Sequence, residues 1–153
     1  MRSIFAKIKG PLQLGSMVFL FFSSLLVQGQ SEEKFIGQVR MMNVVEAECT
    51  LKDGRYEIRF RDVKKRRFHK YASFYFPEED KNYLKLKDKV LTGFEDMPEE
   101  PELLDFTEER VELQFSKSSG VASFRFAILQ GKKDKRTYSS WFNKTKAEKI
   151  FGI

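Results

Sequence analysis

The stretch VVEAECTLKDGRYEIRFR (residues 44–61) alternates apolar and polar residues on both sides of a short turn. A period of two is typical of β-strands, and Gly54 can adopt the positive φ that a tight turn requires. The residues that share the apolar faces are Val45, Ala47, Cys49, Leu51, Tyr56, Ile58 and Phe60. The stretch therefore predicts a β-hairpin in which the thiol of Cys49 is buried.

Segments with the same period follow along the chain. They are YASFYF (71–76), YLKL (83–86), VLTGF (90–94), VELQF (111–115) and VASFRFAIL (121–129). Together with the hairpin they make about seven short strands, separated by turn-forming residues. This pattern predicts a mainly β domain, folded as a small antiparallel β-barrel or β-sandwich.

The C-terminal stretch SSWFNKTKAEKIFG (residues 139–152) predicts a short helix that ends at Gly152. Ala147, Ile150 and Phe151 fall on one face of such a helix. The helix begins at the two serines, which suit its first turn, or only after Phe142 if residues 137–142 form a strand.

Residues 1–29 differ in character from the rest of the chain. Arg2, Lys7 and Lys9 precede the uncharged run MVFLFFSSLLV (17–27), and small and polar residues follow. This order is typical of a secretory signal peptide, here cleaved after Gly29. We therefore expect residues 30–153 to form a single β-rich domain, exported by a bacterium to the periplasm or the medium. The alternative is an uncleaved N-terminal anchor, although the run is shorter than the roughly 20 residues that span a bilayer.

The charge of the chain depends partly on this leader. The whole sequence has 28 Lys and Arg against 22 Asp and Glu, a net charge of +6. The leader holds three basic and no acidic residues, so 25 against 22 remain after cleavage, or about +3. Such a mildly basic domain does not indicate nucleic-acid binding. Cys49 is the only cysteine, which excludes an intramolecular disulfide.

Two predicted hairpins resemble each other. YEIRF and ASFYF (56–60 and 72–76) match VELQF and ASFRF (111–115 and 122–126). Duplication of one hairpin explains the match, and so does the narrow choice of residues that favour strands in a chain with 16 Phe. The two connections differ, because the second is short and contains Gly120 whereas the first is longer and rich in lysine and arginine.

We call this first connection, residues 61–71, the basic arm. Its candidate binding residues are Arg61, Lys64, Lys65, Arg66, Arg67, Phe68, His69, Lys70 and Tyr71. Clustered cations attract an anionic partner from a distance, and aromatic rings can hold it at short range. The arm therefore predicts binding to an anionic lipid, an acidic glycan or an acidic protein surface. Nucleic acid is disfavoured for an exported domain.

The alternative is that the chain neutralises its own arm. An acidic segment lies between residues 95 and 109, and Leu103, Leu104 and Phe106 can pin it to the domain. Its acidic residues are Glu95, Asp96, Glu99, Glu100, Glu102, Asp105, Glu108 and Glu109. The segment could cover the arm as an intramolecular lid or meet it across a dimer. The spacing does not match a calcium-binding EF-hand loop.

The sequence contains no recognisable catalytic motif. His69 is the only histidine, which excludes metal sites with two histidines, and the serine-hydrolase, phosphate-loop, dinucleotide and C-x-x-C motifs are missing. We predict no catalytic residue, metal or cofactor, and favour a non-enzymatic binding module that uses the basic arm. The first alternative is a small barrel that carries one apolar ligand. The second is an envelope enzyme with two carboxylates facing each other across a cleft.

Overall fold

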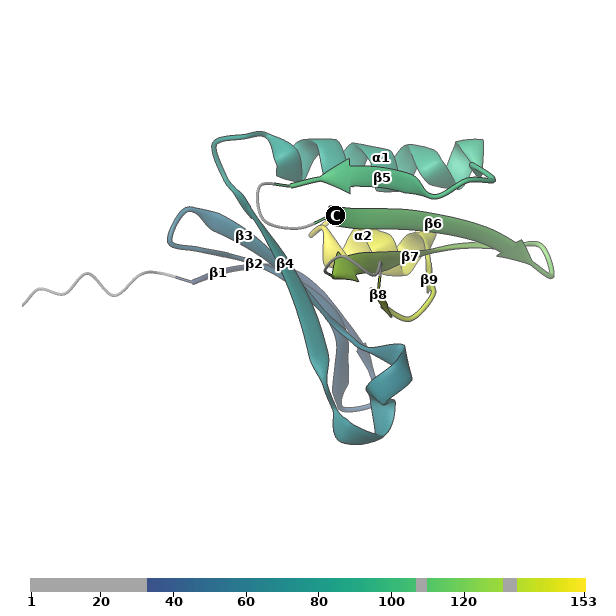
Figure 1. Cartoon of the computed structure of the whole chain (residues 1–153), viewed down its shortest axis with the longest axis horizontal. Helices are drawn as coiled ribbons and strands as arrows, with labels where there is room; N and C mark the ends of the chain where they lie inside the picture. The colour runs from purple at the N-terminus through teal and green to yellow at the C-terminus, as the bar shows by residue number, and fades with distance from the viewer. Residues whose placement is uncertain (1–32, 107–109, 131–134) are drawn as a thin grey trace, which may run out of the picture. The chain divides into compact units, whose positions relative to one another are not determined.

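A computed structural model describes residues 33–106, 110–130 and 135–153 (Figure 1). These residues form nine strands, two α-helices and one short 3-10 helix. The predicted signal peptide and its cleavage point lie outside the described residues. The described residues belong to one compact unit, and the residues named below as its core all lie within it.

The first four strands form one antiparallel sheet. They are β1 (Lys34–Met41), β2 (Val44–Lys52), β3 (Arg55–Arg61) and β4 (Tyr71–Pro77), in the order β1-β2-β3-β4. The hairpin predicted for residues 44–61 is confirmed, because β2 pairs with β3 and Cys49 lies opposite Ile58. Asp53 and Gly54 form its turn with φ values of 52° and 68°.

The remaining strands form a second antiparallel sheet. They are β5 (Glu102–Asp105), β6 (Arg110–Ser118), β7 (Val121–Gln130), β8 (Lys135–Tyr138) and β9 (Phe142–Asn143). Their order is β5-β6-β7-β8, and β9 also pairs with β7. The predicted strands at residues 111–115 and 121–129 are confirmed. Within the described residues the two sheets do not close into a barrel, so the sandwich is the correct one of the two predicted folds (Figure 1).

The strands predicted for residues 83–86 and 90–94 are wrong. This part of the chain is one helix, α1 (Asn82–Asp96), whose buried residues Leu86, Val90 and Gly93 recur at helical spacing. The short apolar runs alternate locally and so resemble strands. The usual start signal is also missing, because the residue before the helix, Lys81, makes no side-chain capping bond.

The C-terminal helix is confirmed as α2 (Lys144–Ile150), and it begins at the later of the two predicted starts. Asn143 caps it, since its Oδ1 accepts a hydrogen bond of 3.0 Å from the amide of Lys146. The helix packs against β1 at Gly37, where a Cβ atom would overlap the carbonyl oxygen of Lys149. Gly152 follows the helix with a φ of 66°.

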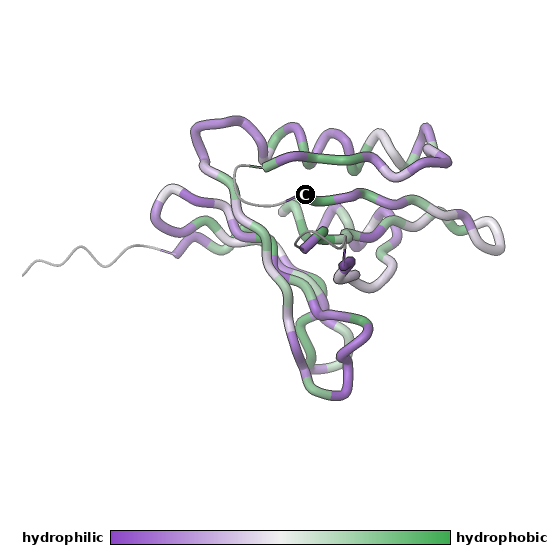
Figure 2. Tube along the Cα trace, viewed as in Figure 1, coloured by the Kyte–Doolittle hydropathy of each residue, from purple (hydrophilic) through white to green (hydrophobic). Residues whose placement is uncertain are grey.

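Phenylalanine side chains fill the space between the sheets. Phe126 of β7 lies 5.9 Å from Phe60 and 5.5 Å from Phe74, measured between ring centroids. Both partners come from the first sheet, so these contacts join the two layers. Figure 2 shows the matching alternation of hydrophobic and hydrophilic residues along the strands. This burial of the apolar faces stabilises the sandwich.

The two similar hairpins are not structural copies. In the first, Phe60 lies opposite Ala72, whereas the matching residues of the second are out of register, because Phe115 lies opposite Phe124. Ala122 lies opposite Lys117 instead. The two-residue difference favours the explanation by shared strand-forming residues over duplication.

Candidate functional site

The basic arm is a folded connection between β3 and β4. Its middle is the 3-10 helix η1 (Val63–Phe68), and the buried Asp62 caps this helix by accepting a hydrogen bond of 2.9 Å from the amide of Lys64. The amide of Asp62 donates to the carbonyl oxygen of Lys70 at 3.0 Å, which closes the base of the arm. His69 ends η1 in the left-handed conformation.

A buried carboxylate fixes the arm to the sandwich. Glu46 of β2 is 3% exposed and accepts hydrogen bonds from Arg61 at 3.0 Å and from Arg66 at 3.5 Å. Ser140 donates to the same carboxylate at 2.6 Å and accepts a bond of 2.8 Å from Arg66. We call Glu46, Arg61, Arg66 and Ser140 the anchor cluster. Two of the predicted binding cations therefore hold the arm in place.

The surroundings of Glu46 keep it ionised. Burial acts to raise its pKa, but hydrogen bonds from Ser140 and Arg61 and the charges of Arg66 and Arg61 outweigh burial. The pKa of Glu46 therefore lies below its ordinary value. The carboxylate of Glu112 is also buried, and its pKa is likewise lowered, chiefly because Arg136 donates hydrogen bonds to it. A proton donor in glycoside hydrolysis needs a raised pKa, so neither carboxylate has the protonation behaviour of one.

Four residues form the outward end of the arm, and we call them the tip: Lys65, Arg67, Phe68 and Lys70. All four are exposed, and the Phe68 side chain is 74% exposed. Among the described residues, the side chains of Arg67 and Lys70 make no hydrogen bond or ion pair. Lys65 makes one loose ion pair of 4.0 Å with Asp62. The tip thus presents cations around an exposed aromatic ring.

Lys64 and Tyr71 turn toward the protein, whereas the predicted binding residue His69 is exposed. The ammonium group of Lys64 donates to the carbonyl oxygen of Arg136 at 3.3 Å and lies 5.0 Å from the centre of the Tyr138 ring. The hydroxyl of Tyr71 donates to the carbonyl oxygen of Val45 at 3.1 Å. Its ring stacks with the guanidinium of Arg59 at 4.9 Å. These contacts stiffen the base of the arm.

The acidic segment has ion-pair partners outside the arm. Glu95 and Asp96 end α1, Glu102 and Asp105 belong to β5, and Glu99 and Glu100 are exposed between these elements. Glu108 and Glu109 lie outside the described residues. The ion pairs are Glu95 with Lys144 at 3.5 Å, Glu102 with Lys89 at 2.8 Å and Asp105 with Arg110 at 3.4 Å. In the described part of the chain, the carboxylate that meets the arginines of the arm is Glu46.

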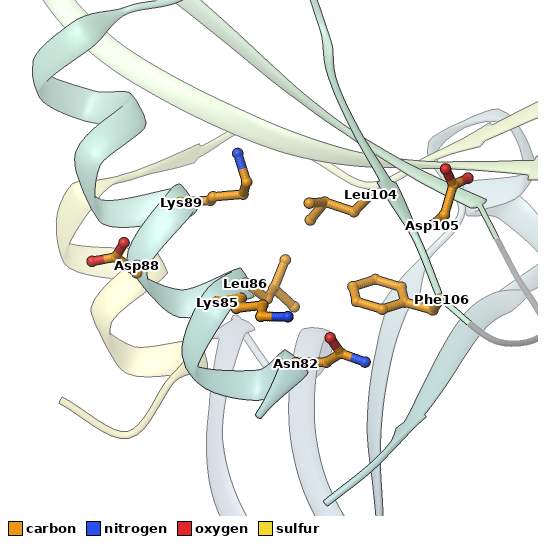
Figure 3. A pocket seen from close by; sticks show the side chains of 8 residues that line it. All are labelled: Asn82, Lys85, Leu86, Asp88, Lys89, Leu104, Asp105 and Phe106. Atoms are coloured by element: carbon orange, nitrogen blue, oxygen red, sulfur yellow. The ribbon is translucent and has the colours of Figure 1, made fainter. Parts of the chain in front are cut away.

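A small pocket lies between α1 and β5 (Figure 3). Its volume is about 270 Å³, and Leu86, Leu104 and Phe106 point into it. Polar groups surround this apolar centre: Asn82, Lys85, Asp88, Lys89 and Asp105. The pocket lies beside the helix, whereas a barrel that carries an apolar ligand would hold it between the sheets, where phenylalanine rings pack.

The remaining chemistry of the described residues is sparse. Cys49 is buried and free, and burial raises the pKa of its thiol to about 12. Residues 33–106, 110–130 and 135–153 contain no group of three or more metal-binding side chains. No helix in this part of the chain has the length and apolar character needed to cross a membrane.

Sequence reasoning identified the arm but missed its anchor. The run of cations is continuous in the sequence, whereas Glu46 and Ser140 are separated by 94 positions. In β2, Glu46 stands on the polar side of the alternation and gives no sign of burial.

Comparison of the chain with protein-family models, curated proteins and solved structures finds no match.

Proposed function

We propose that the chain is an exported, non-enzymatic binding module whose tip contacts an anionic lipid surface. The observation that carries this proposal is the division of the arm into two parts. The anchor cluster uses Arg61 and Arg66 within the protein, while the tip leaves Arg67, Phe68 and Lys70 exposed to solvent. A stiff base with unpaired cations at its end suits recognition of an external anion.

The exposed ring favours lipid over the other anionic partners. Phe68 can enter the interface between headgroups and acyl chains, while Lys65, Arg67 and Lys70 remain near the anionic headgroups. Each cation near such a surface contributes about 1 kcal/mol. With about 1–2 kcal/mol for the ring, the total is about 5 kcal/mol, which corresponds to weak and reversible binding. An acidic glycan and an acidic protein surface are the alternative partners, and the experiments below distinguish them from lipid.

The test measures binding of residues 30–153 to vesicles. The variant K65S/R67S/K70S removes three tip charges, and K52S/K117S/K146S removes three exposed charges elsewhere as a matched control. We expect the tip variant to bind anionic vesicles at least about tenfold more weakly, the control to change about twofold or less, and both to keep the melting temperature. Equal losses in the two variants would contradict the proposal.

Phe68→Ser tests the lipid assignment separately. It should weaken binding to anionic vesicles by about tenfold and leave binding to soluble acidic polymers, such as polyglutamate and heparin, unchanged. If Phe68→Ser instead weakened binding to the soluble polymers and left vesicle binding unchanged, a polymeric anion would be the partner of the tip.

The pocket between α1 and β5 supports a second candidate function, the carriage of a small amphiphile. Leu86, Leu104 and Phe106 offer an apolar surface, and Lys85 stands at its edge for an acidic head group. Organic extraction of the purified protein and mass spectrometry of the extract test this function. A stoichiometric ligand whose recovery is lost in Leu104→Trp would support carriage, and an empty extract would count against it.

A further inference from the structure

The outer face of the second sheet holds a guanidinium group in an ordered position. Arg125 of β7 lies over the ring of Tyr138 at 4.2 Å and over that of Trp141 at 4.4 Å. Its Nε donates a hydrogen bond of 2.9 Å to the side-chain oxygen of Gln114. Two rings and one hydrogen bond therefore restrict both the position and the rotation of the guanidinium plane.

A chain of hydrogen bonds orients the partner of Arg125. The amide nitrogen of Gln114 donates to Glu112 at 3.0 Å, which leaves the amide oxygen facing Arg125. Glu112 is 6% exposed and accepts a further bond of 3.0 Å from Arg136. Among the described residues, the two terminal nitrogens of Arg125 make no hydrogen bond, and they are not among the buried atoms that lack a partner. Arg125 thus offers two parallel donors to an anion in solvent.

A hollow lined by hydroxyl groups lies beside Trp141. Its volume is about 350 Å³, and Ser116, Ser118 and Ser123 line it together with the tryptophan. Ser116 and Ser123 face each other across β6 and β7. In the described part of the chain, the three hydroxyl groups make no side-chain hydrogen bond. Trp141 is 41% exposed, so an aromatic surface and three unused hydroxyls adjoin the ordered guanidinium.

We propose that this face binds a sugar that carries a carboxylate. The carboxylate pairs with the two terminal nitrogens of Arg125, the sugar ring packs on Trp141, and the serines bond the sugar hydroxyls. This surface combines one cation, one aromatic ring and several hydroxyls, which complements an acidic saccharide better than a lipid or an apolar segment. The site goes beyond the proposed function and does not depend on the tip.

The fluorescence of Trp141 tests the proposal directly, because the chain contains one tryptophan. Residues 30–153 are titrated with trigalacturonic acid and with its methyl ester, which keeps the rings and removes the charges. We expect a saturable change with the acid and at least about tenfold weaker binding of the ester. No change up to millimolar acid, or an equal response to the ester, would overturn the proposal.

Variants assign the effect to the site. Arg125→Gln should weaken binding of the acid by at least about tenfold, and Arg125→Lys should recover only part of this loss because a lysine cannot form the two parallel bonds. The double variant S116A/S123A changes no packed ring and should lose about fivefold at an unchanged melting temperature. Unaltered affinity in this variant, or in a folded Arg125→Gln protein, would overturn the proposal.

The tip variant K65S/R67S/K70S separates this site from the proposed function. Its affinity for trigalacturonic acid, measured by Trp141 fluorescence, should equal that of the wild type, even though its vesicle binding is weakened. Loss of the fluorescence response in the tip variant would show that the acid binds at the arm, and would overturn the assignment to Arg125.

Discussion

At the scale of single residues, Glu46 has the largest structural role in the arm. Its carboxylate joins Arg61 and Arg66 to Ser140, so residues from β2, β3, η1 and the segment after β8 meet at one buried group. Removing the charge leaves the arginines without their acceptor, and a buried group that loses its partner costs more than the bond itself contributes. The arm's position therefore depends on Glu46.

We predict that Glu46→Gln lowers the free energy of unfolding by about 1–3 kcal/mol, because the two arginines use different carboxylate oxygens and the amide nitrogen that replaces one of them cannot accept a hydrogen bond. Chemical denaturation measures the change. Glu48→Gln is the matched control on the same strand: its partner Arg59 is partly exposed, so we expect a loss below about 1 kcal/mol. Equal losses in the two variants would show that burial of Glu46 adds nothing to the free energy of unfolding.

The stabilisation from Glu46 should also depend on pH. Its folded pKa lies below the ordinary value of 4.5, so between the two values the unfolded chain binds more protons and stability rises with pH. The contribution is complete above about 4.5 and is lost as the pH falls through the folded pKa. Denaturation at several pH values should show the difference between wild type and Glu46→Gln shrinking in acid. A difference that grows in acid would contradict this sign.

At the scale of secondary structure, the elements that were predicted correctly are those with uninterrupted alternation and a clear turn, such as β2 and β3. β1 escaped prediction because its register shifts near Gly37 and again between Val39 and Arg40, which interrupts the period of two. α1 escaped it because Lys81 provides no side-chain cap. In both cases the local sequence signal for the element is weak.

Gly37→Ala should reveal the close contact between β1 and α2. A Cβ atom would overlap the carbonyl oxygen of Lys149, which belongs to the helix backbone and cannot turn away as a side chain can. We expect a loss of about 2 kcal/mol or more in the free energy of unfolding, although alanine is usually the better residue in a strand. Gln38→Ala, which lies next along β1 and is only partly buried, should change stability by about 0.5 kcal/mol or less. A neutral Gly37→Ala variant would mean that β1 and α2 do not pack this closely.

At the scale of the whole described fold, the two sheets position the arm and the surface around Arg125. Phe60, Phe74 and Phe126 join the layers, and the arm is fixed to both of them through Glu46 on one side and the carbonyl oxygen of Arg136 on the other. Sequence reasoning found the class of fold and the charge of the arm because both are continuous patterns. It could not find the anchor cluster or the surface around Arg125, because their members meet only after the sheets pack.

The central claim is that the tip binds an anionic surface outside the protein. The most direct measurement is binding of residues 30–153 to anionic and neutral vesicles across a salt series. We predict binding to anionic vesicles that weakens by about tenfold or more between about 20 mM and about 200 mM NaCl, and much weaker binding to neutral vesicles. Binding that does not change with salt concentration, or that is equal on anionic and neutral vesicles, would contradict the account.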